Sequence, residues 1–135
     1  MPDAPTLPPL LDRISDYVDW YATRQPHAEA MVLGSRRYRY AELKARVDDI
    51  ARALIAAGVR HGDRVATLAK PHPDFWVLFL ATSSIGAIWV GLNPRYQLEE
   101  CQYVVGDADP ILLFCRTRIG ERDFAGDIAT LREQN

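Results

Sequence analysis

The residues best placed to contact a ligand are Asn93, Pro94 and Arg95, which follow an apolar segment typical of a parallel strand. Ligands in open α/β sheets gather beyond the carboxyl ends of the strands. At such a position Arg95 would supply a fixed positive charge for an anionic group. The same three residues also fit a rigid turn that carries a surface arginine, and both interpretations stay open.

The glycines do not predict a phosphate-binding loop. Gly86 and Gly91 have the separation of P-loop glycines, but Leu92-Asn93 stand where Lys and Ser/Thr are required. Gly58 and Gly62 fit the end of a helix and a turn. The sequence therefore predicts no cofactor-binding residue.

The histidines and cysteines lack the neighbours that metal binding or nucleophilic catalysis requires. His27, His61 and His72 fall in predicted loops with no second ligand at metal spacing, so we expect them to be solvated. Cys101 on a helical stripe and Cys115 at a strand end are expected to be core thiols, with no base beside either. We therefore predict no metal ligand and no catalytic residue in this chain.

These residues belong to segments that alternate between strand and helix patterns. The strongest helix carries the apolar stripe Leu43, Val47, Ile50 and Leu54 and should end at Gly58. Apolar patterns and turn residues predict other helices over 10–24, 73–85 and 97–105, and a final helix exposed to solvent over 127–133. Strands are predicted over 65–69, 88–92 and 111–115. A hairpin is predicted from segments 30–33 and 38–40, which flank residues 34–37. This order predicts βαβ units, a parallel sheet and an α/β fold.

The composition fits one globular domain. The 135 residues are 48% hydrophobic and 25% charged, and the net charge of −2 offers no general attraction to nucleic acid or anionic membrane. The arginine- and tyrosine-rich run 36–40 fits a hairpin with one solvated face better than an RNA contact. With two cysteines, a disulfide framework is not expected, and a reduced cytoplasmic location is the simplest reading.

Residues 75–94 carry no charged side chain and have about the length that a bilayer span requires. A single-span membrane protein is therefore one alternative. Residues 82–84 and Gly86 interrupt the middle of this run with polar groups and a helix breaker. A helix, a turn and a strand covered on both faces in an α/β core account for these breaks, so we expect no membrane span.

Four blocks follow one another in the middle of the chain. They are Tyr-x-Glu-Leu at 40–43, Gly-Val-x-x-Gly-Asp-x-Val at 58–65, Pro-Asp-Phe at 73–75, and Gly-Ala at 86–87 with Leu-Asn-Pro-Arg at 92–95 and Glu-Glu at 99–100. In order and spacing they resemble the N-terminal segment of adenylate-forming enzymes of the acyl-CoA synthetase branch. The resemblance extends from about Tyr17 to Cys115. Arg39 departs from the family's threonine, so a capping box with Glu42 is lost at a cost of about 1 kcal/mol unless another group caps the helix.

The resemblance implies a complete enzyme that joins a carboxylic acid to CoA through an acyl-adenylate, with ATP and Mg²⁺. The family's Pro-Lys-Gly phosphate loop, its aromatic-Gly-x-Thr-Glu motif and its Thr-Gly-Asp motif do not occur in this sequence. We therefore expect residues 10–135 to be a partial N-terminal domain that is truncated before the phosphate loop and is inactive alone. Residues 1–9 contain four prolines, and we expect them to form a flexible arm.

The expected partner is the remainder of an adenylate-forming enzyme or a complementing subunit, and we expect no nucleic acid. ATP, Mg²⁺ and CoA are implied for the complete family member, and this chain alone is expected to bind none of them. One further alternative stays open, a stand-alone binding module that docks onto a separate ligase or carrier protein.

Overall fold

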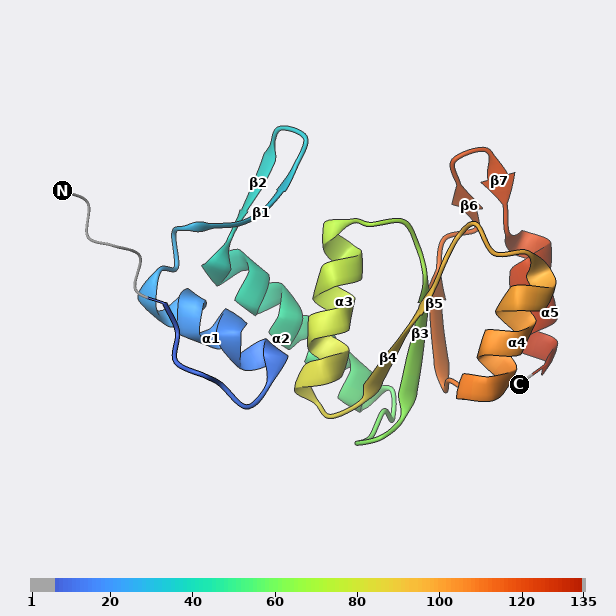
Figure 1. Ribbon diagram of the computed structural model, residues 1–135, viewed down its shortest axis with the longest axis horizontal. Coiled ribbons are helices and arrows are strands. Elements are labelled where there is room, and N and C mark those ends of the chain that lie inside the picture. The colour runs from blue at the N-terminus through green and yellow to red at the C-terminus, as the bar shows by residue number, and fades with distance from the viewer. Residues whose placement is uncertain (1–6, 135) are drawn as a thin grey trace.

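A three-stranded parallel sheet forms the centre of the molecule (Figure 1). The computed structural model describes residues 7–134, so residues 1–6 of the expected arm lie outside the described residues. The strands are β3 (Arg64–Leu68), β4 (Ile88–Leu92) and β5 (Leu112–Cys115), in the order β4-β3-β5. Both strand pairs are parallel. The α/β class and the parallel sheet are therefore confirmed.

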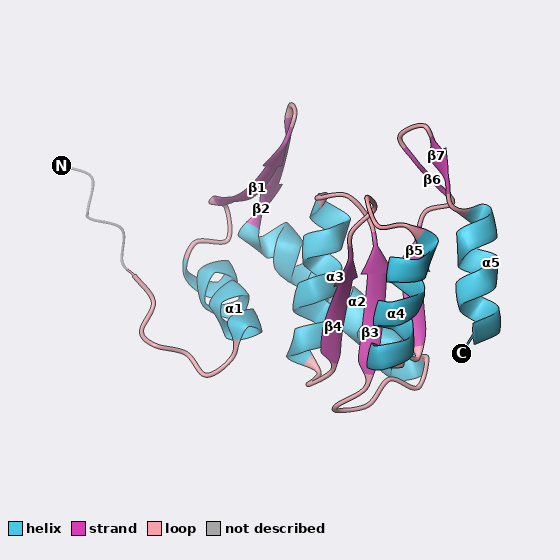
Figure 2. Cartoon of the chain, turned by 45° about the vertical axis from the view of Figure 1, so that its right-hand side comes forward, coloured by secondary structure: helices cyan, strands magenta, loops and turns pink. Residues whose placement is uncertain are grey.

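Helices cover both faces of this sheet (Figure 2). The helices are α1 (Ile14–Arg24), α2 (Tyr40–Ala56), α3 (Pro73–Ser84), α4 (Leu98–Ala108) and α5 (Ala125–Gln134). The first three pack together over one face, and α4 and α5 lie over the other. Helices α3 and α4 are the crossovers that join successive parallel strands, which is the predicted βαβ arrangement.

The core divides into two clusters because side chains of a strand alternate between the faces of a sheet. Val65 of β3 packs with the predicted α2 stripe, in which Leu43, Val47 and Leu54 are buried. Leu68 of β3 packs instead with residues of α4 and α5. The sheet is thus held from both sides by apolar burial.

Helix α1 is shorter than predicted. It begins at Ile14, and Leu10, which the apolar spacing included, is 96% exposed. The backbone N–H of Arg13 donates to Asp16 Oδ2 at 3.2 Å, which fixes the helix start by a capping contact that apolar periodicity does not detect. The predicted end at Arg24 is confirmed.

Helix α2 starts without a side-chain cap, as predicted from Arg39, which stands where the resembled family has threonine. Two backbone carbonyls take the place of the missing cap. Tyr40 N donates to Ala28 O at 3.1 Å, and Ala41 N donates to Pro26 O at 3.0 Å. Because these contacts satisfy two orphan N–H groups of the first turn, the expected loss in stability is largely offset.

The predicted hairpin is present with a tighter turn. Strands β1 (Glu29–Leu33) and β2 (Arg36–Arg39) are joined by two residues only, and Gly34 has a φ of +58°. The prediction of a loop over residues 34–37 was wrong, because Arg36 and Arg37 pair with β1. A two-residue turn in this left-handed conformation matches the twist of the strands.

The C-terminal part of the chain differs most from the prediction. Helix α4 continues to Ala108, and a small hairpin, β6 (Arg118–Ile119) and β7 (Arg122–Asp123), was not predicted. Helix α5 begins at Ala125 and is not simply exposed, because Leu131 is only 1% exposed and packs with the α4 side chains. Short elements with few apolar residues give little periodic signal.

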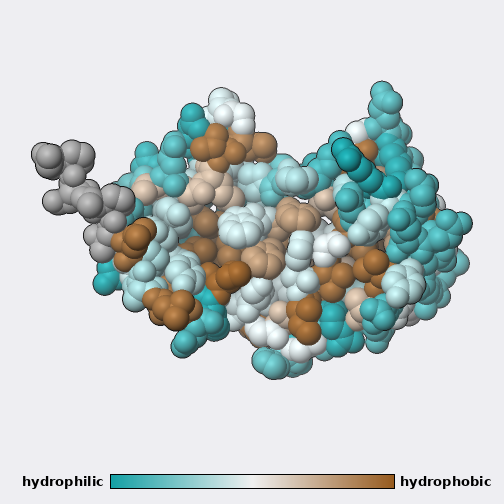
Figure 3. All heavy atoms as spheres, viewed as in Figure 1, coloured by the Kyte–Doolittle hydropathy of each residue, from teal (hydrophilic) through white to brown (hydrophobic). Residues whose placement is uncertain are grey.

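The uncharged run 75–94 is divided between α3, a turn and β4. Gly86, with a φ of +75°, ends the helical part. Among residues 7–134, no helix is long and apolar enough to cross a membrane. The expected cover on both faces of strand β4 is incomplete, because Ile88 is 52% exposed. The strand also lies at one edge of the sheet. Hydrophobic residues also reach the surface in the middle of the molecule (Figure 3).

Candidate functional site

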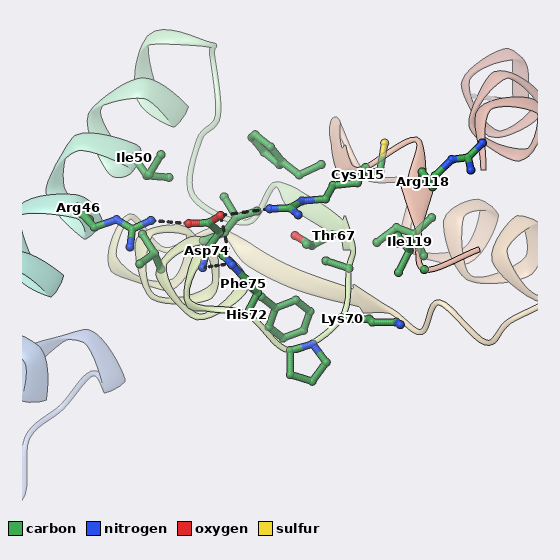
Figure 4. Close-up of a pocket in the computed structure, with 18 of the residues that line it drawn as sticks. Arg46, Ile50, Thr67, Lys70, His72, Asp74, Phe75, Cys115, Arg118 and Ile119 are labelled. Carbon is green, nitrogen blue, oxygen red and sulfur yellow. Dashed lines mark hydrogen bonds and ion pairs between the residues drawn. The ribbon is translucent and has the colours of Figure 1, made fainter. Parts of the chain in front are cut away.

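A cleft of about 720 Å³ lies at the carboxyl ends of β3 and β5 (Figure 4). Its walls come from α2, from the start of α3, from the segments that leave the two strands, and from β6. Most of its inner surface is apolar, formed by Ile50, Val77, Leu78, Phe75, Phe114 and Ile119. Neither face of β5 is fully covered here, which leaves the cleft open beside that strand.

The edge of the cleft carries four basic side chains and two acidic ones, namely Arg46, Lys70, Arg116, Arg118, Asp49 and Asp74. Asp74 is the centre of the acidic part. It accepts a hydrogen bond from Arg46, and Arg116 Nη2 lies 3.7 Å from its Oδ2 (Figure 4). Asp49 pairs with Arg52 at 2.6 Å. Both carboxylates are therefore already matched by arginines.

Two of the basic side chains have no such partner. Within residues 7–134, neither Lys70 nor Arg118 forms an ion pair or a side-chain hydrogen bond. The Lys70 ammonium lies 3.4 Å from the position that a Cβ on Gly120 would occupy, so it reaches the β6–β7 turn across the cleft. The cleft thus combines an apolar floor with a net positive edge, which suits an apolar partner that carries negative charge.

Arg46 and His72 hold the start of α3 in place. The Arg46 guanidinium lies 5.4 Å from the ring centroid of Tyr38, and its Nη1 is buried without a hydrogen-bond partner in the described part of the chain. His72 Nδ1 accepts from Asp74 N at 3.1 Å and also lies 3.2 Å from Asp74 Oδ2. One nitrogen cannot both accept and donate, so a ring without a proton on Nδ1 caps the helix, whereas a ring with a proton on Nδ1 would donate to the carboxylate instead.

Aromatic packing fixes the floor of the cleft next to β4. Trp89 Nε1 donates to Thr67 Oγ1 at 3.1 Å, and Thr67 lines the cleft. The Trp89 ring meets Phe75 and Phe79 edge-on, with centroids 4.7 and 5.4 Å apart. Gly91 leaves room for this indole, because a Cβ there would lie 2.7 Å from Trp89 Cη2. The glycine spacing noted in the sequence therefore has a packing role.

The candidate residues Asn93, Pro94 and Arg95 follow β4 and do not line this cleft. Asn93 Oδ1 accepts from Arg95 N at 2.9 Å, which makes a local turn. Arg122 clasps the same loop from the β6–β7 hairpin, donating to Pro94 O at 3.3 Å and to Tyr96 O at 2.7 Å. A contact between Arg95 and an anionic ligand stays a prediction.

The two cysteines have different surroundings. Cys101 is buried, as predicted, but Cys115 is exposed and lines the cleft, so the prediction of a core thiol was wrong at that position. The reason is that β5 ends at an uncovered edge of the sheet. Desolvation by the surrounding side chains raises the pKa of both thiols, that of Cys101 in the core and that of Cys115 beside the cleft, and this disfavours the nucleophilic thiolate.

The histidines also fall into two kinds. His27 and His61 are exposed, whereas His72 is half-buried and caps α3 at the cleft, a role that the sequence analysis missed. The signal was present, since His72 stands directly before a proline at the first helical position and an aspartate at the second. No group of three or more potential metal ligands occurs within residues 7–134.

Comparisons with known proteins agree over most of the chain. The model of the family described as AMP-binding enzyme matches residues 18–134. A feruloyl-CoA synthase from Amycolatopsis sp is 40% identical over 92 residues, which is 68% of this chain and 19% of that protein. An acyl-CoA ligase, sidI, from Aspergillus fumigatus is 37% identical over 95 residues, which is 70% of this chain and 16% of that protein.

Solved structures give the same result for the fold. The N-terminal domain of FACL13 from Mycobacterium tuberculosis superposes with a TM-score of 0.80 at 27% identity, covering 90% of this chain and 30% of that one. A fatty acyl CoA synthetase from the same organism superposes with a TM-score of 0.79 at 28% identity, covering 89% of this chain and 23% of that one. The chain thus spans less than a third of each relative. It belongs to the AMP-binding enzyme family and corresponds to the N-terminal part of the acyl-CoA ligase fold.

Proposed function

We propose that this chain is the N-terminal scaffold of an ATP-dependent acid–CoA ligase and that it supplies framework without reacting groups. The observation that carries the proposal is the family match over residues 18–134, combined with a share of 16–19% of the length of the curated relatives. The complete enzyme would bind ATP, Mg²⁺, CoA and a carboxylic acid. A location in the cytoplasm fits such an enzyme and is part of the proposal.

Inactivity of the chain alone follows from the chemistry of the proposed reaction. Forming an acyl-adenylate requires neutralising phosphate charge and aligning a carboxylate with the α-phosphate. The Pro-Lys-Gly phosphate loop of the resembled family does not occur in these 135 residues. The basic side chains at the cleft, such as Lys70 and Arg118, are exposed, so water and salt screen their charge.

A chimeric enzyme tests the scaffold role. The matching segment of the Amycolatopsis feruloyl-CoA synthase would be replaced by the aligned part of this chain, and formation of feruloyl-CoA would be measured. We expect a soluble enzyme with measurable ligase activity. A matched control carries Leu68→Asp, which puts a charge in the fully buried centre of the sheet and should abolish folding. A chimera that melts like the parent enzyme and yet forms no product would contradict the proposal.

The second candidate is a stand-alone binding module that docks onto a separate ligase or carrier protein. One observation favours it, namely that Val65, Ala66 and Leu68 of the central strand are fully buried within this chain alone. A module should be monodisperse in analytical ultracentrifugation and should not bind a hydrophobic dye. A scaffold that lacks its neighbours should bind the dye, because Ile88, Ile111 and Phe114 are 52%, 48% and 39% exposed.

A further inference from the structure

The Nδ1 atom of His72 has two partners that it cannot serve at once. It lies 3.1 Å from the backbone nitrogen of Asp74 and 3.2 Å from Asp74 Oδ2 (Figure 4). The backbone N–H needs a lone pair on Nδ1, whereas the carboxylate needs a proton there. The protonation of this one nitrogen therefore decides which of the two contacts forms.

The Asp74 carboxylate is shared in a similar way. Its Oδ1 accepts a hydrogen bond from Arg46 Nη2, so this oxygen has a fixed partner. Its Oδ2 lies 3.2 Å from His72 Nδ1 and 3.7 Å from Arg116 Nη2. While Nδ1 carries a lone pair, two electron-rich atoms face each other, and Arg116 is the better partner for Oδ2. Once Nδ1 carries a proton, it offers Oδ2 a charge-assisted hydrogen bond.

Other charged side chains at the cleft act on the His72 ring in opposite directions. The charged residues that line the cleft with it are Lys70 of its own segment, Arg46 and Asp49 of α2, Asp74 of α3, Arg116 after β5 and Arg118 of β6. The basic side chains and the positive end of α3 disfavour a charged imidazole. The Asp74 carboxylate favours it and is the group in direct contact. The contact with Asp74 is therefore the one that a protonated ring would strengthen.

Helix α3 can keep its start in both states. Asp74 N is exposed and belongs to the first turn, so water can replace the imidazole as its acceptor. Pro73, at the first helical position, has no N–H to satisfy and has a backbone conformation preset for the helix. Trp76 N donates to His72 O at 3.2 Å, a backbone contact that does not involve the ring. Exchange of the cap therefore changes side-chain contacts without unwinding the helix.

We propose that His72 is a pH-sensitive switch that controls the positive charge at the edge of the cleft. With a lone pair on Nδ1 the ring caps α3, and Asp74 Oδ2 pairs with Arg116. In acid Nδ1 donates to Oδ2, and Arg116 is released beside Lys70 and Arg118, which have no ionic partner within residues 7–134.

The switch works through a change of partner. The protonated ring and the Asp74 carboxylate neutralise each other, so the released Arg116 guanidinium is the charge that the edge of the cleft gains. Histidine is the side chain that normally changes its charge between pH 8 and pH 5, whereas lysine and arginine stay charged over this range. All the residues involved belong to this chain, so the switch does not depend on the proposed ligase role.

Nuclear magnetic resonance of the isotope-labelled chain tests the exchange directly. At pH 8 the imidazole nitrogen signals should show a neutral His72 ring with its proton on Nε2, because Nδ1 accepts from Asp74 N. Between pH 8 and pH 5.5 the signals of His72 Nδ1, the Asp74 amide and the Arg116 guanidinium should change with one midpoint. The exposed His27 is an internal control, and its titration should not move the Arg116 signal.

Inorganic sulfate is the probe for the gain in charge, because its own charge is constant over this range. It should bind about fivefold more tightly at pH 5.5 than at pH 8, the effect of one added charge close to the anion in water. Shifts of the Lys70 and Arg118 side-chain signals would show that sulfate binds at the cleft.

Two variants separate the switch from general effects of acid. His72→Asn keeps a side-chain acceptor at the N-cap but cannot be protonated, so it should melt like the parent chain and bind sulfate almost equally at both pH values. Arg116→Gln, at an exposed position, should likewise lose the pH dependence. The control variant His27→Asn removes an exposed histidine outside the cleft and should keep the full fivefold change.

Three results would overturn the proposal. The first is a neutral His72 ring at pH 8 with its proton on Nδ1, and the second is an Arg116 signal that stays constant while His72 titrates. The third is a full gain in sulfate affinity in Arg116→Gln or in His72→Asn, because the added charge would then come from another group. Activity or inactivity of the chimeric ligase bears on the scaffold role and leaves each of these results unchanged.

Discussion

Replacing Arg122 with methionine should destabilise the C-terminal third of the chain by about 2–3.5 kcal/mol. Arg122 donates to Tyr96 O at 2.7 Å and to Pro94 O at 3.3 Å, pairs with Asp127 at 2.8 Å, and lies 4.3 Å from the ring centroid of Phe124. The charged hydrogen bond to Tyr96 contributes about 1–1.5 kcal/mol at this degree of exposure. The ion pair and the cation–π contact add about 0.5–1 kcal/mol each, since the side chain is one-third exposed.

Urea unfolding followed by circular dichroism would measure this loss, with hydrogen exchange at residues 93–96 as a local readout. Arg122→Lys should recover only the ion pair with Asp127, because an ammonium cannot reproduce the fork that reaches two carbonyls. Arg118→Met, at an exposed position without a partner, is the matched control and should change stability by less than about 0.5 kcal/mol. If Arg122→Met changes the free energy of unfolding by no more than this limit, the hydrogen bonds from Arg122 to Pro94 and Tyr96 contribute nothing and our reasoning is wrong.

Three other predictions concern single positions. Gly86→Ala should lower the free energy of unfolding in urea by about 2 kcal/mol or more, because φ is +75° and the new Cβ would lie 2.5 Å from His61 Cδ2. A loss under about 0.5 kcal/mol would count against this prediction. Arg39→Thr restores the family's capping residue, and since backbone carbonyls already serve that helix start, thermal melting should rise by no more than about 2–3 °C. A thiol reagent should modify Cys115 and leave Cys101 protected until unfolding, and equal rates at both cysteines would refute this. Because desolvation raises the pKa of Cys115, its reaction rate should level off at a higher pH than that of a free thiol.

Long periodic segments were the most predictable part of the fold. The stripe of Leu43, Val47 and Leu54 gave α2 and its buried face, and Ile88–Leu92 matched β4 at both ends. These elements bury continuous apolar surface, so packing imposes a pattern that the sequence displays. Gly58, with a φ of +95°, ended the α2 region where a left-handed residue was expected.

Features fixed by polar contacts were less predictable. The start of α1 depends on a hydrogen bond to Asp16, and the β6–β7 hairpin depends on Arg122 reaching a loop 26 and 28 residues away in sequence. Cys115 was placed in the core because its strand is apolar, but exposure depends on whether a neighbour covers the edge of the sheet. Long-range contacts of this kind leave no local periodicity.

The cleft could not be predicted from the sequence, because its walls come from segments 46–50, 67–78 and 114–120, which only the fold brings together. The sequence directed attention to Asn93, Pro94 and Arg95, the residues that follow β4. The structure adds the carboxyl ends of β3 and β5 as a second candidate surface, and Lys70 and Arg118 gain meaning only from their position beside it.

Acid-dependent exchange of pyrophosphate into ATP by the purified 135-residue chain is the most direct test of the central claim. The assay would use ferulate and fatty acids of several lengths, with Mg²⁺ and with the intact Amycolatopsis enzyme as a positive control for ferulate. Our account predicts no exchange above that of a heat-denatured sample with any acid, because this chain provides framework alone. Exchange above that background, dependent on one of the acids, would contradict it.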